Sequence, residues 1–158
     1  MATFFCIGDN VKKHPEVYER ILSEGHAVGN HTFHHLNGWK NKTEEYVRNV
    51  AQCDEVMKRT RTNYRSDSFL FRPPYGRISR KQIQALVAYR IIMWDVLSLD
   101  YDKHVTPEAC LSNTIKATRS GSIIVFHDSL KAEKSMVYAL PRYLDYFSSR
   151  GFSFKTIR

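Results

Sequence analysis

Short apolar runs alternate along the chain with longer segments in which apolar residues recur every three or four positions. The runs are typical of buried strands, and the longer segments are typical of helices that cover a sheet. The runs predict strands at residues 2–7, 27–29, 68–71, 89–94, 122–126 and 152–157. The other segments predict helices at residues 15–23, 43–60, 79–88, from 106 onward, and at 136–149. Six strands with intervening helices indicate an α/β fold with a parallel sheet or a barrel.

Local signals mark where several of these helices begin. Ser79 and the glutamine three residues later form a capping box, and Thr106 precedes a proline at the first helical position. Thr43 is a suitable cap for the longest helix. Pro141 lies near the start of the last expected helix, where a proline is tolerated.

The 158 residues are most simply one domain, residues 1–158, which is long enough to bury a core. Hydrophobic residues make up 42% of the chain and charged residues 25%, as in ordinary globular proteins. No run is long enough for a membrane span, and none has the pattern of a signal peptide. The three cysteines stand singly, which favours buried thiols over a disulfide framework and leaves the compartment open.

The net charge of +8 raises the question of nucleic-acid binding. The lysines and arginines are scattered, however, and form no long basic tract with interleaved aromatic residues. Because a nucleic-acid interface needs a clustered basic face, we expect no nucleic-acid partner. A basic surface suits anionic glycans or cell-wall polymers equally well.

Three histidines lie in residues 31–35, directly after the second expected strand. Imidazole is the commonest protein ligand for divalent transition metals. His31 and His35 are four residues apart, so on a helical turn they would share one face, while His34 would point elsewhere. The alternative is an exposed polar loop that is rich in histidine.

Polar residues follow four consecutive expected strands, at the edge where ligands gather in parallel α/β folds. Any one of them has an ordinary structural explanation, such as a helix cap or a satisfied core histidine. The regularity favours an active site at this edge. The residues are His31, His35, Arg72, Asp95, Asp100, His127 and Asp128.

Five segments in this order resemble the polysaccharide deacetylase family, which is carbohydrate esterase family four or the NodB homology domain. They are residues 2–5, 24–35, 71–76, 94–101 and 121–128. The resemblance runs from end to end of the chain. It implies a distorted (β/α) barrel, here incomplete at its N-terminus. It also implies a metal-dependent hydrolase that removes N- or O-acetyl groups from a carbohydrate polymer such as peptidoglycan or a chitin-like glycan.

The resemblance implies roles for residues after the second and third strands. His31 and His35 would be two metal ligands, with zinc as the expected ion and cobalt or nickel as alternatives. Arg72 would orient and tune the catalytic base. Tyr75 would offer its backbone N–H to the oxyanion that forms during hydrolysis, beside Pro74 as a substrate-binding residue.

Further roles fall on residues after the fourth strand and in the fifth. Asp100 would hold and tune His127, which would be the general acid toward the leaving amine. Val125 would line the pocket for the acetyl methyl group. Tyr101, another expected substrate contact, stands where the family usually has tryptophan.

One family feature is not found in this sequence. The family's opening strand ends in an Asp-Asp pair, which supplies the third metal ligand and the catalytic base, and the chain begins after that position. Asp9, Asp95 and Asp128 are no obvious substitutes, and structural roles are expected for the last two. We therefore expect weak or no activity and little or no bound metal. An unpaired barrel edge would also favour a homodimer.

Three explanations of this departure stay open. The start of the chain is cut or wrongly assigned, or the protein is a relic that binds glycan without cleaving it, or another carboxylate completes the site. A small-molecule amidohydrolase of the same family is a further alternative. Residues 72–75 and 127–128 favour the glycan branch over it. Relatives commonly act in the cell envelope or outside the cell, but this sequence does not identify the compartment.

Overall fold

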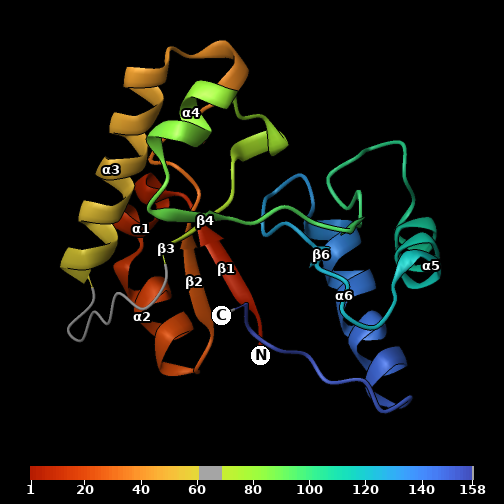
Figure 1. Ribbon diagram of the computed structural model, residues 1–158. Coiled ribbons are helices and arrows are strands. Elements are labelled where there is room, and N and C mark those ends of the chain that lie inside the picture. Colours follow the sequence, from red (N-terminus) through yellow and green to blue (C-terminus); the bar gives the residue numbers. More distant parts are fainter. Residues whose placement is uncertain (61–68, 158) are drawn as a thin grey trace. The chain divides into compact units, whose positions relative to one another are not determined.

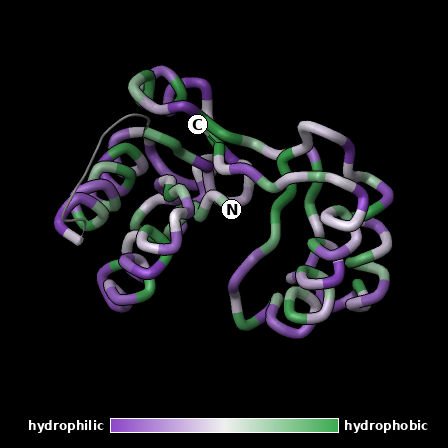
Figure 2. Tube along the Cα trace, turned by 90° about the horizontal axis from the view of Figure 1, so that it is seen from below, coloured by the Kyte–Doolittle hydropathy of each residue, from purple (hydrophilic) through white to green (hydrophobic). Residues whose placement is uncertain are grey.

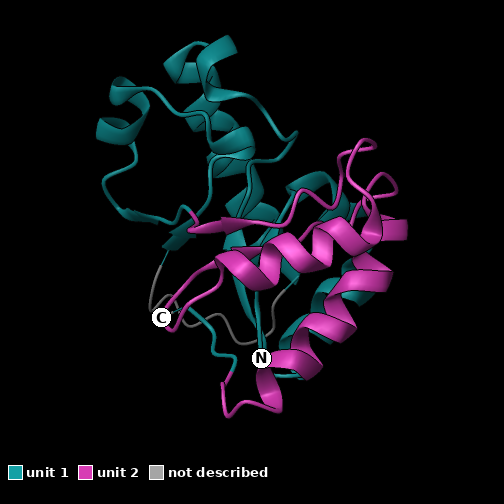
Figure 3. Cartoon of the chain, turned by 90° about the vertical axis from the view of Figure 1, so that its right-hand side faces the viewer, with its two compact units in different colours: residues 1–93, 154–158 teal, residues 94–153 magenta. Residues whose placement is uncertain are grey.

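The computed structural model describes residues 1–60 and 69–157, which form two compact units (Figure 3). Unit 1 consists of Met1–Met93 together with the C-terminal residues from Phe154, and unit 2 consists of Trp94–Ser153. Assignment of residues 1–158 to one domain stays a prediction. In the part of the chain that the structure describes, no helix is both long and apolar enough to cross a bilayer.

Unit 1 contains a four-stranded parallel sheet in the order β1-β2-β3-β4 (Figure 1). Its strands are β1 (Thr3–Cys6), β2 (Ala27–Asn30), β3 (Phe69–Phe71) and β4 (Tyr89–Ile91). Each lies within or overlaps an expected strand, although Ser68 of the third expected strand falls outside the described residues. β1 is an edge strand of this sheet, so dimerisation through that edge stays a prediction.

The helices of unit 1 follow its strands as the sequence pattern predicts. They are α1 (Gly8–Lys13), α2 (Pro15–Ser23), α3 (Thr43–Thr60) and α4 (Arg80–Ala85), with two short 3₁₀ helices, η1 (Gly38–Lys40) and η2 (Pro74–Gly76). α2 and α3 have the expected bounds. The Ser79 capping box is present, with both reciprocal hydrogen bonds. α1 was not predicted, because its six residues are too few to show a helical period.

The core of unit 1 consists of two clusters, each of which includes buried residues of α3. Apolar residues recur at helical spacing along α3. Figure 2 shows apolar and polar positions alternating along the helices. The buried members of the first cluster are Val11, Tyr18, Phe33, Cys53 and Met57. Those of the second are Tyr46, Val50, Phe71 and Leu86. The first cluster includes Phe33 of the loop after β2, and the second includes Phe71 at the end of β3.

Unit 2 contains a parallel pair of short strands, β5 (Val96–Leu97) and β6 (Ile124–Val125), and two helices that pack together, α5 (Pro107–Ala117) and α6 (Glu133–Ser148). Thr106 caps α5 by accepting a hydrogen bond from the backbone N–H of Ala109. β5 was not predicted as a strand. Pro141 lies inside α6 and not near its start, because the helix begins at Glu133, earlier than expected. Because proline has no backbone N–H, α6 lacks one helical hydrogen bond at Pro141.

The expected strand at residues 152–157 is wrong. All six of these residues are described, and none has strand structure. The backbone N–H of Ile157 donates to the side-chain Oγ1 of Thr3 (2.9 Å) rather than to a backbone carbonyl of β1. A strand needs a ladder of backbone hydrogen bonds to a neighbour, and apolar alternation in the sequence does not supply that neighbour.

The three cysteines are free, and Cys53 and Cys110 are buried as predicted. Burial raises the pKa of the Cys53 thiol to about 12 and that of Cys110 to about 11. Cys6 is only partly buried. Because burial disfavours the reactive thiolate form, the two buried cysteines are suited to a packing role in the core.

We expect Tyr46→Phe to raise the free energy of unfolding by about 1 kcal/mol. The Tyr46 side chain is fully buried, and its hydroxyl has no hydrogen-bond partner among the described residues. Burial raises the pKa of this hydroxyl, so it stays an uncharged, unpaired dipole. Denaturant unfolding measures the change. Tyr143→Phe is the matched control, because its hydroxyl bonds to Oγ1 of Thr118 (3.0 Å) and its removal should destabilise. A loss of stability in Tyr46→Phe would contradict the prediction.

Candidate active site

The histidines at residues 31–35 lie in a loop after β2 and not on a helical turn. The backbone φ angles of Thr32 (62°) and His35 (55°) are positive, which interrupts any helix and is unfavourable for residues other than glycine. His31 and His35 nevertheless lie side by side, with ring centroids 5.0 Å apart. The predicted pairing of these two imidazoles is therefore present, but the predicted helical geometry is wrong.

Asn30, the residue before the loop, is buried and uses its whole amide group to hold the loop. Its Oδ1 accepts from the backbone N–H of Thr32 (2.8 Å). Its Nδ2 donates to the carbonyl of Val50 (2.8 Å) and to Oδ1 of Asp54 (2.7 Å), both on α3. The other carboxylate oxygen of Asp54 accepts from the Tyr89 hydroxyl. A buried network thus joins the end of β2 to α3 and β4.

Two further buried polar residues complete this support. Oδ1 of Asn49 on α3 accepts from the backbone N–H groups of Phe33 (2.8 Å) and His34 (2.9 Å). Oγ1 of Thr32 accepts from the N–H of Leu36 (3.0 Å). These supporting residues were not predicted from the sequence. Their signal is the presence of Asn49 and an aspartate on the otherwise apolar face of α3.

Arg72 is a buried cation at the end of β3. Its Nε donates to the carbonyl of Ile92 (3.1 Å) and its Nη2 to that of Met93 (3.0 Å), and the guanidinium lies 4.1 Å from the ring centroid of Phe5. Burial lowers the pKa of Arg72 to about 10, so it stays charged at neutral pH. Within the described ranges no carboxylate forms an ion pair with it.

Arg72 also orients the first histidine of the loop. Its backbone carbonyl lies 2.6 Å from Nδ1 of His31. Because a carbonyl can only accept, Nδ1 carries the proton and the lone pair of the ring is on Nε2. This is the arrangement in which metal-binding histidines are usually held.

Tyr75 lies in η2 and has a positive φ of 59°. Its ring centroid is 4.6 Å from that of His35, and the side chain is 60% exposed. The neighbouring N–H groups of Gly76 and Arg77 donate to the carbonyls of Pro73 and Pro74. No acceptor for the N–H of Tyr75 is found in the described part of the chain. Pro74 is buried beneath it.

In unit 2, Asp100 and His127 form a tightly bonded pair after β5 and β6. Nδ1–H of His127 donates to Oδ1 of Asp100 (2.8 Å), and the backbone N–H of His127 donates to Oδ2 (2.6 Å). The Asp100 side chain is fully buried, whereas the His127 side chain is partly exposed. Leu99, just before Asp100, has a positive φ of 57°. Backbone strain at such a place is typical of functional sites.

The two expected substrate-binding residues of unit 2 adjoin this pair. The ring of Tyr101 meets that of His127 edge to face, with centroids 4.8 Å apart. Val125 is buried in β6, two residues before His127. Unit 1 thus brings together His31, His35, Arg72, Pro74 and Tyr75, and unit 2 brings together Asp100, Tyr101, Val125 and His127.

The remaining acidic candidates do not complete a metal site. Asp9 forms an ion pair with Lys13 on α1 (2.6 Å), and the hydrogen bond from Lys13 lowers the pKa of this carboxylate. Oδ2 of Asp95 accepts from the N–H of Ile123 (2.7 Å), which is the structural role expected for it. Asp128 is exposed. Across residues 1–60 and 69–157, no three His, Cys, Asp or Glu side chains are grouped to hold a metal ion.

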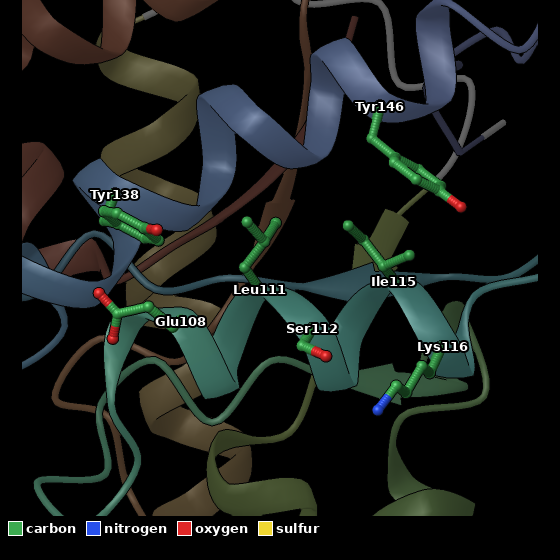
Figure 4. Close-up of a pocket in the computed structure, with 7 residues that line it drawn as sticks. All are labelled: Glu108, Leu111, Ser112, Ile115, Lys116, Tyr138 and Tyr146. Atoms are coloured by element: carbon green, nitrogen blue, oxygen red, sulfur yellow. The ribbon is translucent and has the colours of Figure 1, made fainter.

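A groove of about 430 Å³ lies between α5 and α6 in unit 2, where the rings of Tyr138 and Tyr146 face Leu111 and Ile115 (Figure 4). Its other lining residues are Glu108, Ser112 and Lys116. None of the predicted site residues lines it, and they lie instead at the ends of strands.

The polysaccharide deacetylase family matches residues 1–93, more than half of the 158 residues. The chain belongs to this family. The resemblance seen in the sequence is therefore confirmed, as is the α/β fold with parallel strands.

Other polysaccharide deacetylases extend the match to the rest of the chain. A peptidoglycan-N-acetylglucosamine deacetylase of Bacillus cereus is 31% identical, over 99% of this chain and 56% of that protein. Chitin deacetylase 2 of Saccharomyces cerevisiae is 31% identical, over 88% of this chain and 46% of that protein. The chain thus spans about half the length of these relatives.

A solved structure is similar over nearly the whole chain. The Bc1960 peptidoglycan N-acetylglucosamine deacetylase, in complex with 4-naphthalen-1-yl-N-oxidanyl-benzamide, has a TM-score of 0.88. It is 29% identical, and the match covers 98% of this chain and 72% of that one. The similarity thus extends over residues of both units, and the roles of single residues stay predictions.

Proposed function

We propose that this polysaccharide deacetylase hydrolyses acetyl groups, principally the acetamide of N-acetylglucosamine units, in a polymer such as peptidoglycan or a chitin-like glycan. The observation that carries the proposal is the buried Asp100 bonded twice to a partly exposed His127. An amine leaves an acetamide only when it is protonated, and an oriented histidine is suited to supply that proton. The deacetylase relatives that match both units support the same chemistry.

The roles in unit 2 follow from this geometry. Asp100 fixes the ring of His127 through Nδ1, so the proton for the leaving nitrogen is delivered from Nε2. Tyr101, against the edge of that ring, limits its rotation and contacts substrate. Val125 lines the space for the acetyl methyl group.

In unit 1 the backbone N–H of Tyr75 is the donor that we assign to the developing oxyanion. Its φ is positive and no acceptor for its N–H is found among the described residues, and oxyanion stabilisation needs a preorganised donor of this kind. Arg72 acts as a positioning residue, because its buried charge is suited to orient a catalytic carboxylate. Pro74, the residue before Tyr75, is a substrate-binding residue of the same loop in this proposal.

His31 and His35 would hold the metal ion, for which zinc is the expected element and cobalt or nickel are alternatives. The bond from Nδ1 of His31 to the Arg72 carbonyl fits this role, because it leaves Nε2 as the donor atom. With zinc held by these two histidines, the site would gain a Lewis acid that polarises the acetamide carbonyl. Two imidazoles are only half of a typical four-ligand set, and the described residues place no third ligand beside them.

We therefore expect the 158 residues alone to release acetate slowly from a pentamer of N-acetylglucosamine. The rate should rise with the zinc concentration and should not saturate below about 1 µM zinc. His31→Ala should abolish the zinc dependence. His34→Ala, an exposed histidine of the same loop, is the matched control and should keep it. Acetate assays and zinc titration by calorimetry measure both effects.

Two outcomes would contradict this expectation. Sub-micromolar zinc binding with an ordinary enzymatic rate would show that the chain supplies a third ligand. No release at any zinc concentration would contradict hydrolysis by these residues. It would favour a second candidate function, glycan binding without cleavage, which the incomplete ligand group also favours.

A further inference from the structure

Trp39 is an exposed side chain held in a fixed orientation. It is 63% exposed, although a side chain of its size usually buries most of its surface. Its indole N–H donates to the carbonyl of Ile78 (3.2 Å), and its backbone N–H donates to Oδ1 of Asn37 (3.0 Å). The guanidinium of Arg77 lies 4.0 Å from the indole ring centroid. With one face covered and the N–H paired, the opposite ring face is the part presented to solvent.

The segment that carries Trp39 is packed tightly against the loop after β3. The N–H of Gly38 donates to the carbonyl of Arg77 (3.1 Å), and Gln82 Nε2 donates to the carbonyl of Gly38 (2.8 Å). A Cβ at Gly38 would clash with the Arg77 carbonyl oxygen. The loop between β2 and α3 therefore runs directly beside α4, as Figure 1 shows, and it holds Trp39 in place.

Trp39 adjoins the candidate site through two segments. It follows His35 by four residues, and Arg77, which stacks on it, follows Tyr75 by two residues. Tyr75 in turn contacts His35. All of these residues belong to unit 1, so their mutual placement does not depend on unit 2.

We propose that Trp39 is a carbohydrate-stacking subsite, which binds a pyranose ring of the polymer next to the sugar whose acetyl group is hydrolysed. This inference rests on the proposed function. A pyranose presents C–H groups on its face and hydroxyl groups around its rim. It therefore stacks on a flat apolar ring while its rim keeps polar contacts.

The surroundings of Trp39 favour a sugar over a protein partner. The charged group of Arg77 stacks on the indole, Oδ1 of Asn37 binds the backbone N–H of Trp39, and Lys40 is the next residue in the sequence. An interface anchor in a protein complex normally lies among apolar contacts that exclude water. One rigid aromatic face with hydrogen-bonding groups at its edge matches an amphipathic sugar ring instead, and a rigid ring loses little entropy on binding.

The test uses the two tryptophans of the chain, Trp39 and Trp94. In the Trp94→Phe variant, Trp39 is the sole indole fluorophore. Titration with the N-acetylglucosamine pentamer should change its emission saturably and protect it from quenching by acrylamide. Calorimetry should show that Trp94→Phe binds the pentamer as the natural chain does. Trp39→Ala should weaken binding about tenfold, and Trp39→Phe should weaken it less. Circular dichroism checks that each variant is folded.

Each outcome separates the subsite from the proposed reaction. Equal affinity in Trp39→Ala, binding that leaves Trp39 emission unchanged, or no binding at millimolar pentamer would overturn the subsite. Trp39-dependent binding without acetate release at any zinc concentration would support the subsite and contradict the hydrolase proposal. Acetate release with the same KM in Trp39→Ala would support hydrolysis and overturn the subsite.

Discussion

Asn30→Ala is expected to lower the free energy of unfolding by about 3 kcal/mol or more. The side chain of Asn30 is 2% exposed, and its removal leaves three partners without it: the N–H of Thr32, the carbonyl of Val50 and the carboxylate of Asp54. Unpaired buried groups each cost about 1–3 kcal/mol, and more when charged. The histidine loop should lose its shape with the same change, because Asn30 bonds its backbone directly.

Denaturant unfolding measures the stability, and zinc titration reports on His31 and His35. The matched control is Asn10→Ala, an exposed asparagine on α1 of the same unit, which should change stability little. Asn30→Asp is a sharper variant, because it keeps an acceptor for the Thr32 N–H but cannot donate to Asp54. It should destabilise at least as strongly as alanine. Equal stability of the Asn30→Ala and Asn10→Ala variants would contradict the role of the network.

The histidine pair shows how a correct prediction can rest on the wrong geometry. Spacing of four residues predicted that His31 and His35 lie together on a helical turn, and they do lie together, but on a loop with two positive φ angles. That loop is held by hydrogen bonds that involve Asn49 and Asp54, which both lie on α3. No local pattern around the histidines identifies such partners, because they become neighbours only when the chain folds.

Elements with local sequence signals were predicted well, and elements that depend on distant partners were not. α2 and α5 begin at prolines, Thr106 caps α5, and α3 has amphipathic spacing, and the predicted positions of α2, α3 and the start of α5 are confirmed. Thr43, the expected cap of α3, is the first residue inside that helix. The strand expected at residues 152–157 failed, because a strand requires a partner elsewhere in the chain. Pro141 was placed near a helix start because proline is favoured there, yet packing of α6 against α5 carries the helix through it.

The environment of Arg72 was also beyond the sequence. The family resemblance implies that Arg72 orients the catalytic base. The structure adds that the charge of Arg72 is buried against two backbone carbonyls and the ring of Phe5. Phe5 lies far from Arg72 in the sequence and reaches it across the sheet. Such a cation remains in a low-dielectric site only because backbone dipoles and an aromatic face partly replace water.

His127→Gln is expected to slow release of acetate from the N-acetylglucosamine pentamer by about 10²–10⁴-fold relative to the unsubstituted chain. Glutamine keeps an amide that can bond to Asp100, but it has no acidic proton to give to the departing amine. Initial rates at one fixed zinc concentration measure the effect. His104→Gln is the matched control, since His104 is an exposed histidine of the same unit and should not matter.

A second substrate separates proton transfer from every other effect of this change. The leaving group of 4-nitrophenyl acetate departs as a stable phenolate and needs no protonation, so its hydrolysis should fall far less in His127→Gln. Loss of folding or of metal binding would slow both substrates equally. A large fall for the acetamide and a small one for the ester therefore assigns His127 as the proton donor. An equal fall for both would assign it to positioning, and no fall for either would remove it from the reaction.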